Sequence, residues 1–183
     1  MLNIPEYKEY GGETKIALMD NSSLAFMHEL SQRSYPSDGI LSVYDLILIP
    51  KWVMEEIEDS TYRSTYVEQL QAQGYPIRWI DETKYGAFVN DEDVNLYYIV
   101  EAAVSRVSEL MRFLRRKVKT EDLIDLPSAE EWMNRLYDEW PIHGRTLSTG
   151  RTLKKNAGEI SLTILAEIFA WYHDGVDLSL IHI

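Results

Sequence analysis

A short apolar run at residues 16–19 constrains the fold of this chain more than any other feature. Its four residues, Ile-Ala-Leu-Met, are too few and too continuously apolar for a surface helix, so they predict a strand that is buried on both faces. Such strands belong to the parallel sheets of α/β proteins. Asp20 follows at once, at the carboxyl edge where open α/β sheets bind their ligands. The alternative role for Asp20 is a helix N-cap, because a helical pattern follows over 22–33.

A second apolar run, at 46–49, predicts another buried parallel strand, and Pro50 after it suits the first turn of a helix. In that helix Val53, Glu56 and Ile57 are spaced so that they share one face. Glu56 is therefore turned toward the apolar side, where a carboxylate is costly unless a cation or hydrogen-bond donors compensate it. This position makes Glu56 a candidate metal ligand. A partly solvated surface glutamate is the alternative.

Another acid, Glu159, lies in the first turn of a strongly apolar helix expected over 160–172. The helix dipole favours a carboxylate there, so a purely structural role is the alternative. If the chain winds in the usual way, Glu159 lies at the same sheet edge as Asp20 and Glu56. A last strand then begins at Val176.

We expect the whole chain, residues 1–183, to form a single domain. Residues 1–14 are polar and aromatic and predict a lead-in arm, and residues 82–141 predict a helical elaboration. Within the elaboration, the apolar stripe over 91–118 predicts one long amphipathic helix, which either packs in the core or forms a dimer seam. The remaining expected elements are a strand over 76–80 and an acidic helix over 127–140.

Composition excludes several classes of protein. The net charge of −12 argues against general coating of nucleic acid and against binding to anionic membranes. The chain has no cysteine, which excludes disulfides, thiolate zinc sites and cysteine nucleophiles and fits a reducing compartment. It shows no signal peptide and no apolar run near the ~20 residues that span a bilayer. We therefore expect a cytoplasmic protein that does not enter a membrane.

One basic segment stands out in this acidic chain. Residues 143–156 contain Arg145, Arg151, Lys154 and Lys155 and no acid. Their glycine, serine and threonine content predicts a loop, which can meet phosphate oxygens with side chains and with backbone N–H groups. We expect these four residues to bind single-stranded RNA. A solvated loop without a ligand is the alternative.

Taken together, these residues resemble the PIN-domain family of metal-dependent ribonucleases. The resemblance rests on Asp20 with Ser22 after an apolar strand, on the pattern Pro-x-x-Val-x-x-Glu-Ile over 50–57, and on Gly158-Glu159 at the start of a helix. It implies a three-layer α/β/α sandwich with a central parallel sheet. It also implies Mg²⁺- or Mn²⁺-dependent endoribonuclease activity.

In this resemblance Asp20, Glu56 and Glu159 match the family's metal-binding, catalytic acids, and Ser22 matches its catalytic hydroxyl. The implied partners are RNA and either an antitoxin or a second copy of the chain. General chemistry supports such a site, because clustered carboxylates repel one another at pH 7 unless a hard cation such as Mg²⁺ or Mn²⁺ joins them. The metal lowers the pKa of a bound water, so hydrolysis needs no protein nucleophile. Phosphate-binding loops and the His-Glu-x-x-His and Gly-x-Ser-x-Gly motifs are absent from the sequence.

The family's further acid, expected a few residues after Val176, has no counterpart in the sequence. The competing hypothesis is therefore a PIN-like module without catalysis that binds RNA or a protein through the long helix and residues 143–156. Residues 178–183 read Leu-Ser-Leu-Ile-His-Ile and resemble a translated sequencing adaptor. We expect them to be foreign and the natural chain to continue into a strand that ends in an acid; a genuine terminus that completes the last strand is the alternative.

Overall fold

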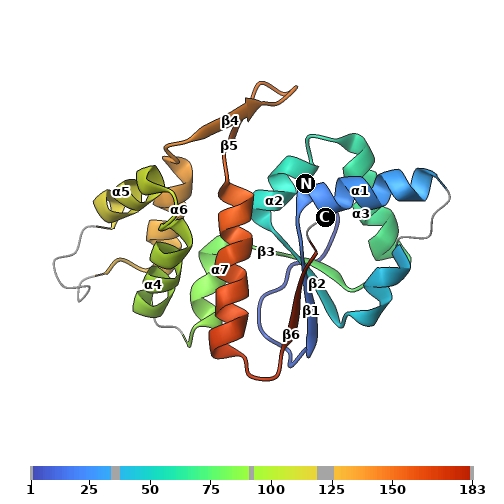
Figure 1. Cartoon of the computed structure of the whole chain (residues 1–183), viewed down its shortest axis with the longest axis horizontal. Coiled ribbons are helices and arrows are strands. Elements are labelled where there is room, and N and C mark those ends of the chain that lie inside the picture. Colours follow the sequence, from blue (N-terminus) through green and yellow to red (C-terminus); the bar gives the residue numbers. More distant parts are fainter. Residues whose placement is uncertain (1, 34–37, 91–92, 119–125, 182–183) are drawn as a thin grey trace.

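A parallel sheet of four strands forms the centre of the computed structural model, which describes residues 2–33, 38–90, 93–118 and 126–181. The strand order is β3-β2-β1-β6. The strands are β1 (Lys15–Met19), β2 (Leu46–Pro50), β3 (Ile77–Ile80) and β6 (Asp177–Ile181). Helices flank the sheet on both sides, so the fold is a three-layer α/β/α sandwich, as predicted (Figure 1).

The two apolar runs that predicted this architecture lie at its centre. Residues 16–19 in β1 and all of β2 are buried. In the register of the sheet, Ile16 lies beside Leu46 on one side and Leu178 on the other. A strand with a neighbour at each edge and a helical layer on each face has no contact with solvent, which is why its side chains are continuously apolar.

Most helices agree with the predicted segments, with ends that differ by a few residues. Figure 1 shows α7 and the helices of the elaboration on one side of the sheet and α1 and α3 on the other. The helices are α1 (Asn21–Gln32), α2 (Lys51–Ile57), α3 (Thr61–Ala72), α4 (Asp93–Val104), α5 (Ser108–Lys117), α6 (Ala129–Asp138) and α7 (Ala157–Tyr172), with 3₁₀ turns η1 (Asp38–Val43) and η2 (Glu82–Phe88).

The single long helix predicted over 91–118 is wrong, because the structure has two helices there, α4 and α5. Val107 precedes α5 with extended backbone angles, and the Ser105 hydroxyl donates to the Ala102 carbonyl at 2.7 Å. The two helices then pack against each other and against α6. The apolar stripe is therefore shared between two helices that fold back into the core of the elaboration.

The loop predicted over 143–156 is also wrong, because this segment forms an antiparallel β-hairpin. Its strands are β4 (His143–Thr146) and β5 (Thr152–Lys154). The turn between them closes through the Leu147 N–H, which donates to the Arg151 carbonyl at 2.7 Å, and Gly150 takes a positive φ of 81°. Ser148 and Gly150 thus belong to the turn, whereas Gly144 lies in β4.

The ends of the described chain both add to the sheet. Trp79 of β3 exchanges two backbone hydrogen bonds with the N-terminal arm, from the Tyr7 N–H at 2.7 Å and to the Pro5 carbonyl at 3.0 Å. Residues 178–181 belong to β6 and pair in parallel with β1 as far as Ile181 beside Met19. Their foreign origin stays a prediction, and residues 182–183 lie outside the described residues. Across the described chain, we find no helix that combines the length and apolarity of a membrane span.

Candidate active site

One pocket at the carboxyl edge of the sheet is lined by Asp20, Glu56 and Glu159 together. Asp20 directly follows β1, Glu56 lies in the last turn of α2, and Glu159 lies in the first turn of α7. The pocket has a volume of about 110 Å³. Its remaining lining residues are Asn21, Ser22, Val53, Asn156, Gly158 and Leu162. Acids that are far apart in the sequence thus share one small cavity.

The carboxylates line this pocket without converging on one point. Among the residues that the structure describes, no group of three or more Asp, Glu, His or Cys side chains is arranged to hold a metal ion. Mg²⁺ commonly keeps several water ligands and takes only one or two carboxylates directly. The arrangement therefore fits a hydrated cation better than an ion held by all three acids.

Asp20 caps the helix that follows it, which was the alternative role predicted for this residue. Its Oδ1 accepts a hydrogen bond from the Ser23 N–H at 2.6 Å, at the N-terminus of α1. The same residue lines the pocket, so capping and a place in the site coexist in one side chain. Ser22, in the first turn of α1, is exposed and lines the pocket as well.

Glu56 is partly buried and lies among charges of both signs. Burial is the largest effect on its carboxyl and raises its pKa, and Glu159 raises it further, whereas a hydrogen bond from Asn21 and the charges of Arg145 and Arg63 oppose the shift. The net direction is upward. A carboxylate in this state gains from a cation, because a cation offsets both the burial and the repulsion.

Asn21 adds an oxygen that no group in the described part of the chain satisfies. Its Nδ2 donates to Glu56 Oε2 at 3.3 Å, while its Oδ1 is buried and has no hydrogen-bond partner. A buried amide oxygen without a partner in a native protein calls for a water or an ion. Together with the carboxylates it makes a set of hard oxygen donors, which suits Mg²⁺ or Mn²⁺.

Gly158 allows α7 to approach α2 at the pocket. A Cβ placed on residue 158 would lie 3.1 Å from Val53 Cγ2 and 3.4 Å from Glu56 Oε1. The preceding turn depends on Asn156, which takes a left-handed conformation with φ of 64°. Glycine at this position thus keeps the first turn of α7, with Glu159, close to Glu56.

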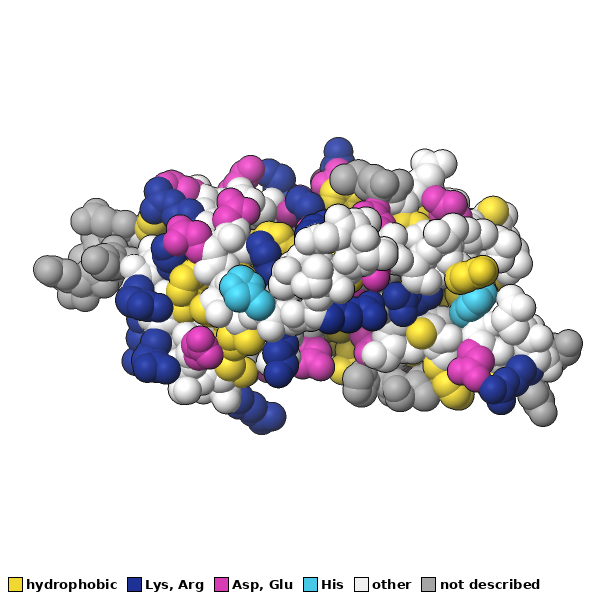
Figure 2. Space-filling view, turned by 90° about the horizontal axis from the view of Figure 1, so that it is seen from above, with side chains coloured by type: hydrophobic (Ala, Val, Ile, Leu, Met, Phe, Trp, Pro, Cys, Tyr) yellow, Lys and Arg dark blue, Asp and Glu magenta, His cyan; other side chains and the backbone are white. Residues whose placement is uncertain are grey.

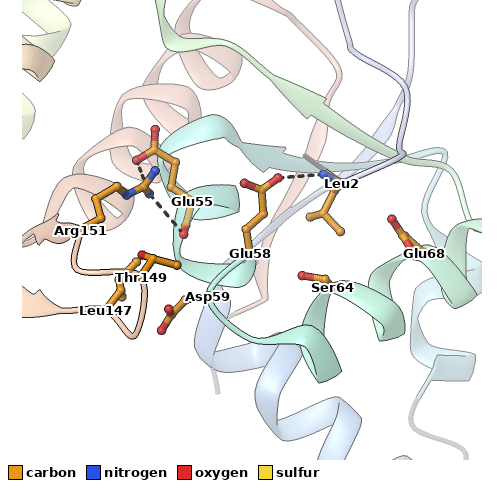
Figure 3. A pocket seen from close by; sticks show the side chains of 9 residues that line it. All are labelled: Leu2, Glu55, Glu58, Asp59, Ser64, Glu68, Leu147, Thr149 and Arg151. Atoms are coloured by element: carbon orange, nitrogen blue, oxygen red, sulfur yellow. Dashed lines mark hydrogen bonds and ion pairs between the residues drawn. The ribbon is translucent and has the colours of Figure 1, made fainter.

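The hairpin cations that the sequence singled out are largely engaged within the protein. Arg151 Nη2 lies 2.7 Å from Glu55 Oε2, and Figure 3 shows the two side chains turned toward each other. Lys154 donates to the Tyr137 carbonyl and lies 3.5 Å from the centroid of the Tyr137 ring. Lys155 is exposed. The structure therefore does not present these cations as one free patch.

Arg151 also lines a larger pocket of about 340 Å³ beside the hairpin turn, in which four of the nine lining residues are acidic (Figure 3). Glu58 in this pocket accepts a hydrogen bond from the Leu2 N–H at 2.8 Å, and Glu68 accepts one from the Asn3 N–H at 3.1 Å. The start of the N-terminal arm is thus held by these carboxylates.

Arg63 belongs to the surroundings of the site, and sequence reasoning missed it. It lies on α3, where its Nη2 donates to the Glu56 carbonyl at 3.5 Å. Its Nε is buried without a hydrogen-bond partner. No periodicity or motif signals this placement, because the contact crosses the turn between α2 and α3.

A scan of protein-family models, a search of curated proteins and a search of solved structures found no match to this chain.

Proposed function

We propose that this chain is a Mg²⁺- or Mn²⁺-dependent endoribonuclease of the PIN type that acts on single-stranded RNA in the cytoplasm. The observation that carries the proposal is the shared pocket of Asp20, Glu56 and Glu159, together with the unsatisfied amide oxygen of Asn21. The charge of Glu159 disfavours the charged form of Glu56 there, and a divalent cation would offset that repulsion.

Asp20, Glu56 and Glu159 would hold the cation, directly or through its water ligands, with the Asn21 oxygen beside them. When bound, the metal lowers the pKa of a bound water and offsets charge on the scissile phosphate. The exposed Ser22 hydroxyl lies at the same pocket and can donate a hydrogen bond to a phosphate oxygen. The partners of this enzyme would be RNA and either an antitoxin or a second copy of the chain.

Metal titration by calorimetry and cleavage of a fluorogenic single-stranded RNA test the proposal. We expect Asp20→Asn and Glu159→Gln to weaken Mn²⁺ binding and to reduce cleavage at least tenfold. Asparagine caps helices as well as aspartate does, so Asp20→Asn separates metal binding from capping. Glu109→Gln, an exposed acid on α5, is the matched control. Metal binding and cleavage that stay intact in both site variants would refute the assignment.

One observation favours a second function. In the described chain, no three Asp, Glu, His or Cys side chains are arranged together to hold a metal ion. This favours a PIN-like module without catalysis that binds RNA or a protein partner. The same experiment separates the two functions. If the chain is a module without catalysis, it should bind RNA but neither bind the metal nor cleave RNA. If it is a nuclease, it should bind RNA, bind the metal and cleave RNA.

A further inference from the structure

We propose that Arg63, Arg145 and Tyr62 form the path along which single-stranded RNA enters the pocket of Asp20, Glu56 and Glu159. The two arginines would bind backbone phosphates and the tyrosine ring would stack on a base. This inference deepens the proposed function and rests on it. The residues come from α3 and from strand β4 of the hairpin, which meet beside α2.

The arginine pair is the first observation. Arg145 Nη2 lies 3.7 Å from Asp59 Oδ2, which is longer than a hydrogen bond, and its side chain is 61% exposed. Arg63 makes one long hydrogen bond, to the Glu56 carbonyl, and keeps a buried Nε without a partner. Both guanidinium groups thus keep N–H groups that make no hydrogen bond within the described chain. Their planar shape suits two parallel hydrogen bonds to a phosphate.

The two arginines also repel each other. Burial lowers the pKa of Arg63, and the charge of Arg145 lowers it further, while Asp59 and Glu56 act in the opposite direction. Two guanidinium groups that repel each other favour anions beside them, and Asp59 and Glu56 supply only part of that charge. Figure 2 shows Lys and Arg side chains spread over this face, with a short row of them near its middle and Asp and Glu side chains among them.

Tyr62 is the second, independent observation. It precedes Arg63 in the first turn of α3, where successive side chains point about 100° apart, and is 77% exposed, the largest exposed fraction among the large hydrophobic side chains described. Its ring is stacked on His28, with centroids 6.4 Å apart and an angle of 26° between the planes. The contact fixes the orientation of the ring and leaves most of it open. Exposed rings beside a positive path are the usual platform for single-stranded bases.

Of the four hairpin cations predicted to bind RNA, only Arg145 is part of this path. Arg151 and Lys154 are held by Glu55 and Tyr137, whereas Arg145 is the hairpin cation whose charge reaches Glu56 in the pocket. Phosphates bound by Arg145 and Arg63 would therefore lie next to the acids.

Fluorescence anisotropy with a labelled oligouridylate, in EDTA so that no cleavage occurs, tests the path. We expect Arg63→Gln and Arg145→Gln each to weaken binding and to lower the slope of log affinity against log salt by about 0.7, the value for one phosphate contact on a single strand. Arg135→Gln, an exposed arginine paired with Glu131 on α6, is the control of equal charge change and should alter neither quantity. Arg63→Lys keeps the charge and the fold, and should retain the salt slope with reduced affinity.

Tyr62→Ala should weaken binding about fivefold or more without changing the salt slope, because stacking carries no charge. Tyr62→Phe should bind like the wild type, and Tyr98→Ala, an exposed tyrosine on α4, is the control. Arginine variants that behave like Arg135→Gln, or a wild type that binds no RNA, overturn the path. Cleavage that depends on Asp20 but not on Arg63, Arg145 or Tyr62 would overturn the path and leave the nuclease. RNA binding that depends on the path, without metal-dependent cleavage, would support the path and overturn the nuclease.

Discussion

At the scale of single residues, Glu82 shows how a buried acid is accommodated away from the pocket. It is fully buried, and its Oε1 accepts hydrogen bonds from the Trp52 N–H at 2.9 Å and from the Ser161 hydroxyl at 2.7 Å. Tyr85 reaches the same serine at 2.9 Å. Glu82 therefore supplies the cap that α2 lacks at Pro50 and connects η2 with α7. Burial raises its pKa to about 8.

This pKa makes stability depend on pH. Because the pKa of Glu82 is about 8 in the folded protein against an ordinary 4.5, the folded state binds more protons than the unfolded state between these values. Its contribution to stability is thus largest below pH 4.5 and decreases toward pH 8, by at most about 1.4 kcal/mol per pH unit. Urea unfolding from pH 5 to pH 8 measures this slope.

Glu82→Gln should flatten the decrease, because glutamine does not titrate, and the exposed Glu130→Gln on α6 should keep it. Parallel pH profiles for the wild type and Glu82→Gln would contradict the buried, protonated state.

The two roles of Asp20 can be separated by substitution. Asp20→Ala should lower the free energy of unfolding by about 1 kcal/mol, because the Ser23 N–H loses its cap, while Asp20→Asn should keep most of it. Both variants should lose cleavage. Denaturant midpoints measure the first effect, with Ser128→Ala, the cap of α6, as a reference for its size. Equal stability of the two Asp20 variants would show that the side chain does not cap α1 in solution.

At the scale of elements, the contact between α7 and α2 positions the pocket. Both helices begin near the carboxyl edge of the sheet, and Gly158 lets their backbones come close enough for Glu159 to share a cavity with Glu56. The hairpin contacts the turn that follows α2, because the Ser148 hydroxyl donates to Asp59 at 3.2 Å. The site thus depends on where three elements meet.

Gly158→Ala should disturb this contact. The added Cβ would lie 3.1 Å from Val53 Cγ2, so the Val53 side chain or the helix must give by a few tenths of an ångström, and overpacking of this kind costs about 1–3 kcal/mol. We expect a lower melting temperature together with weaker Mn²⁺ binding in calorimetry. Gly39→Ala, where a Cβ meets no atom within 4 Å, is the control. Unchanged metal binding in Gly158→Ala would show that the approach of the helices does not position the acids.

At the scale of the whole molecule, a cation bound at the pocket would be a source of stability in a chain with an excess of acids. A ligand that binds only the folded state stabilises it by about 2.7 kcal/mol at a hundred times its Kd. Because the chain carries a net charge of −12, any added salt screens the repulsion among its acids. This effect must be separated from binding of the cation at the pocket.

Mn²⁺ should therefore raise the melting temperature of the wild type more than KCl of equal ionic strength does. In Asp20→Asn and Glu159→Gln the two salts should act alike. Differential scanning calorimetry measures the shifts. A Mn²⁺ effect that persists in both variants would place the ion elsewhere.

The sequence by itself determined the layered fold. Continuous apolar runs at 16–19 and 46–49 require burial on both faces, and only a parallel sheet between helical layers provides it. It also placed Asp20 at the carboxyl edge of the sheet, because the end of a strand is a local property.

Only the tertiary structure decided the break at Val107, the hairpin over 143–154, the roles of Glu82 and Arg63, and the separation of the carboxylates. The spacing of apolar residues reports period and burial along one element. It carries no information on which distant side chain meets which, as when Glu82 meets Trp52 thirty residues away. Such contacts are set by how the elements pack, and these contacts give the pocket its shape and charge.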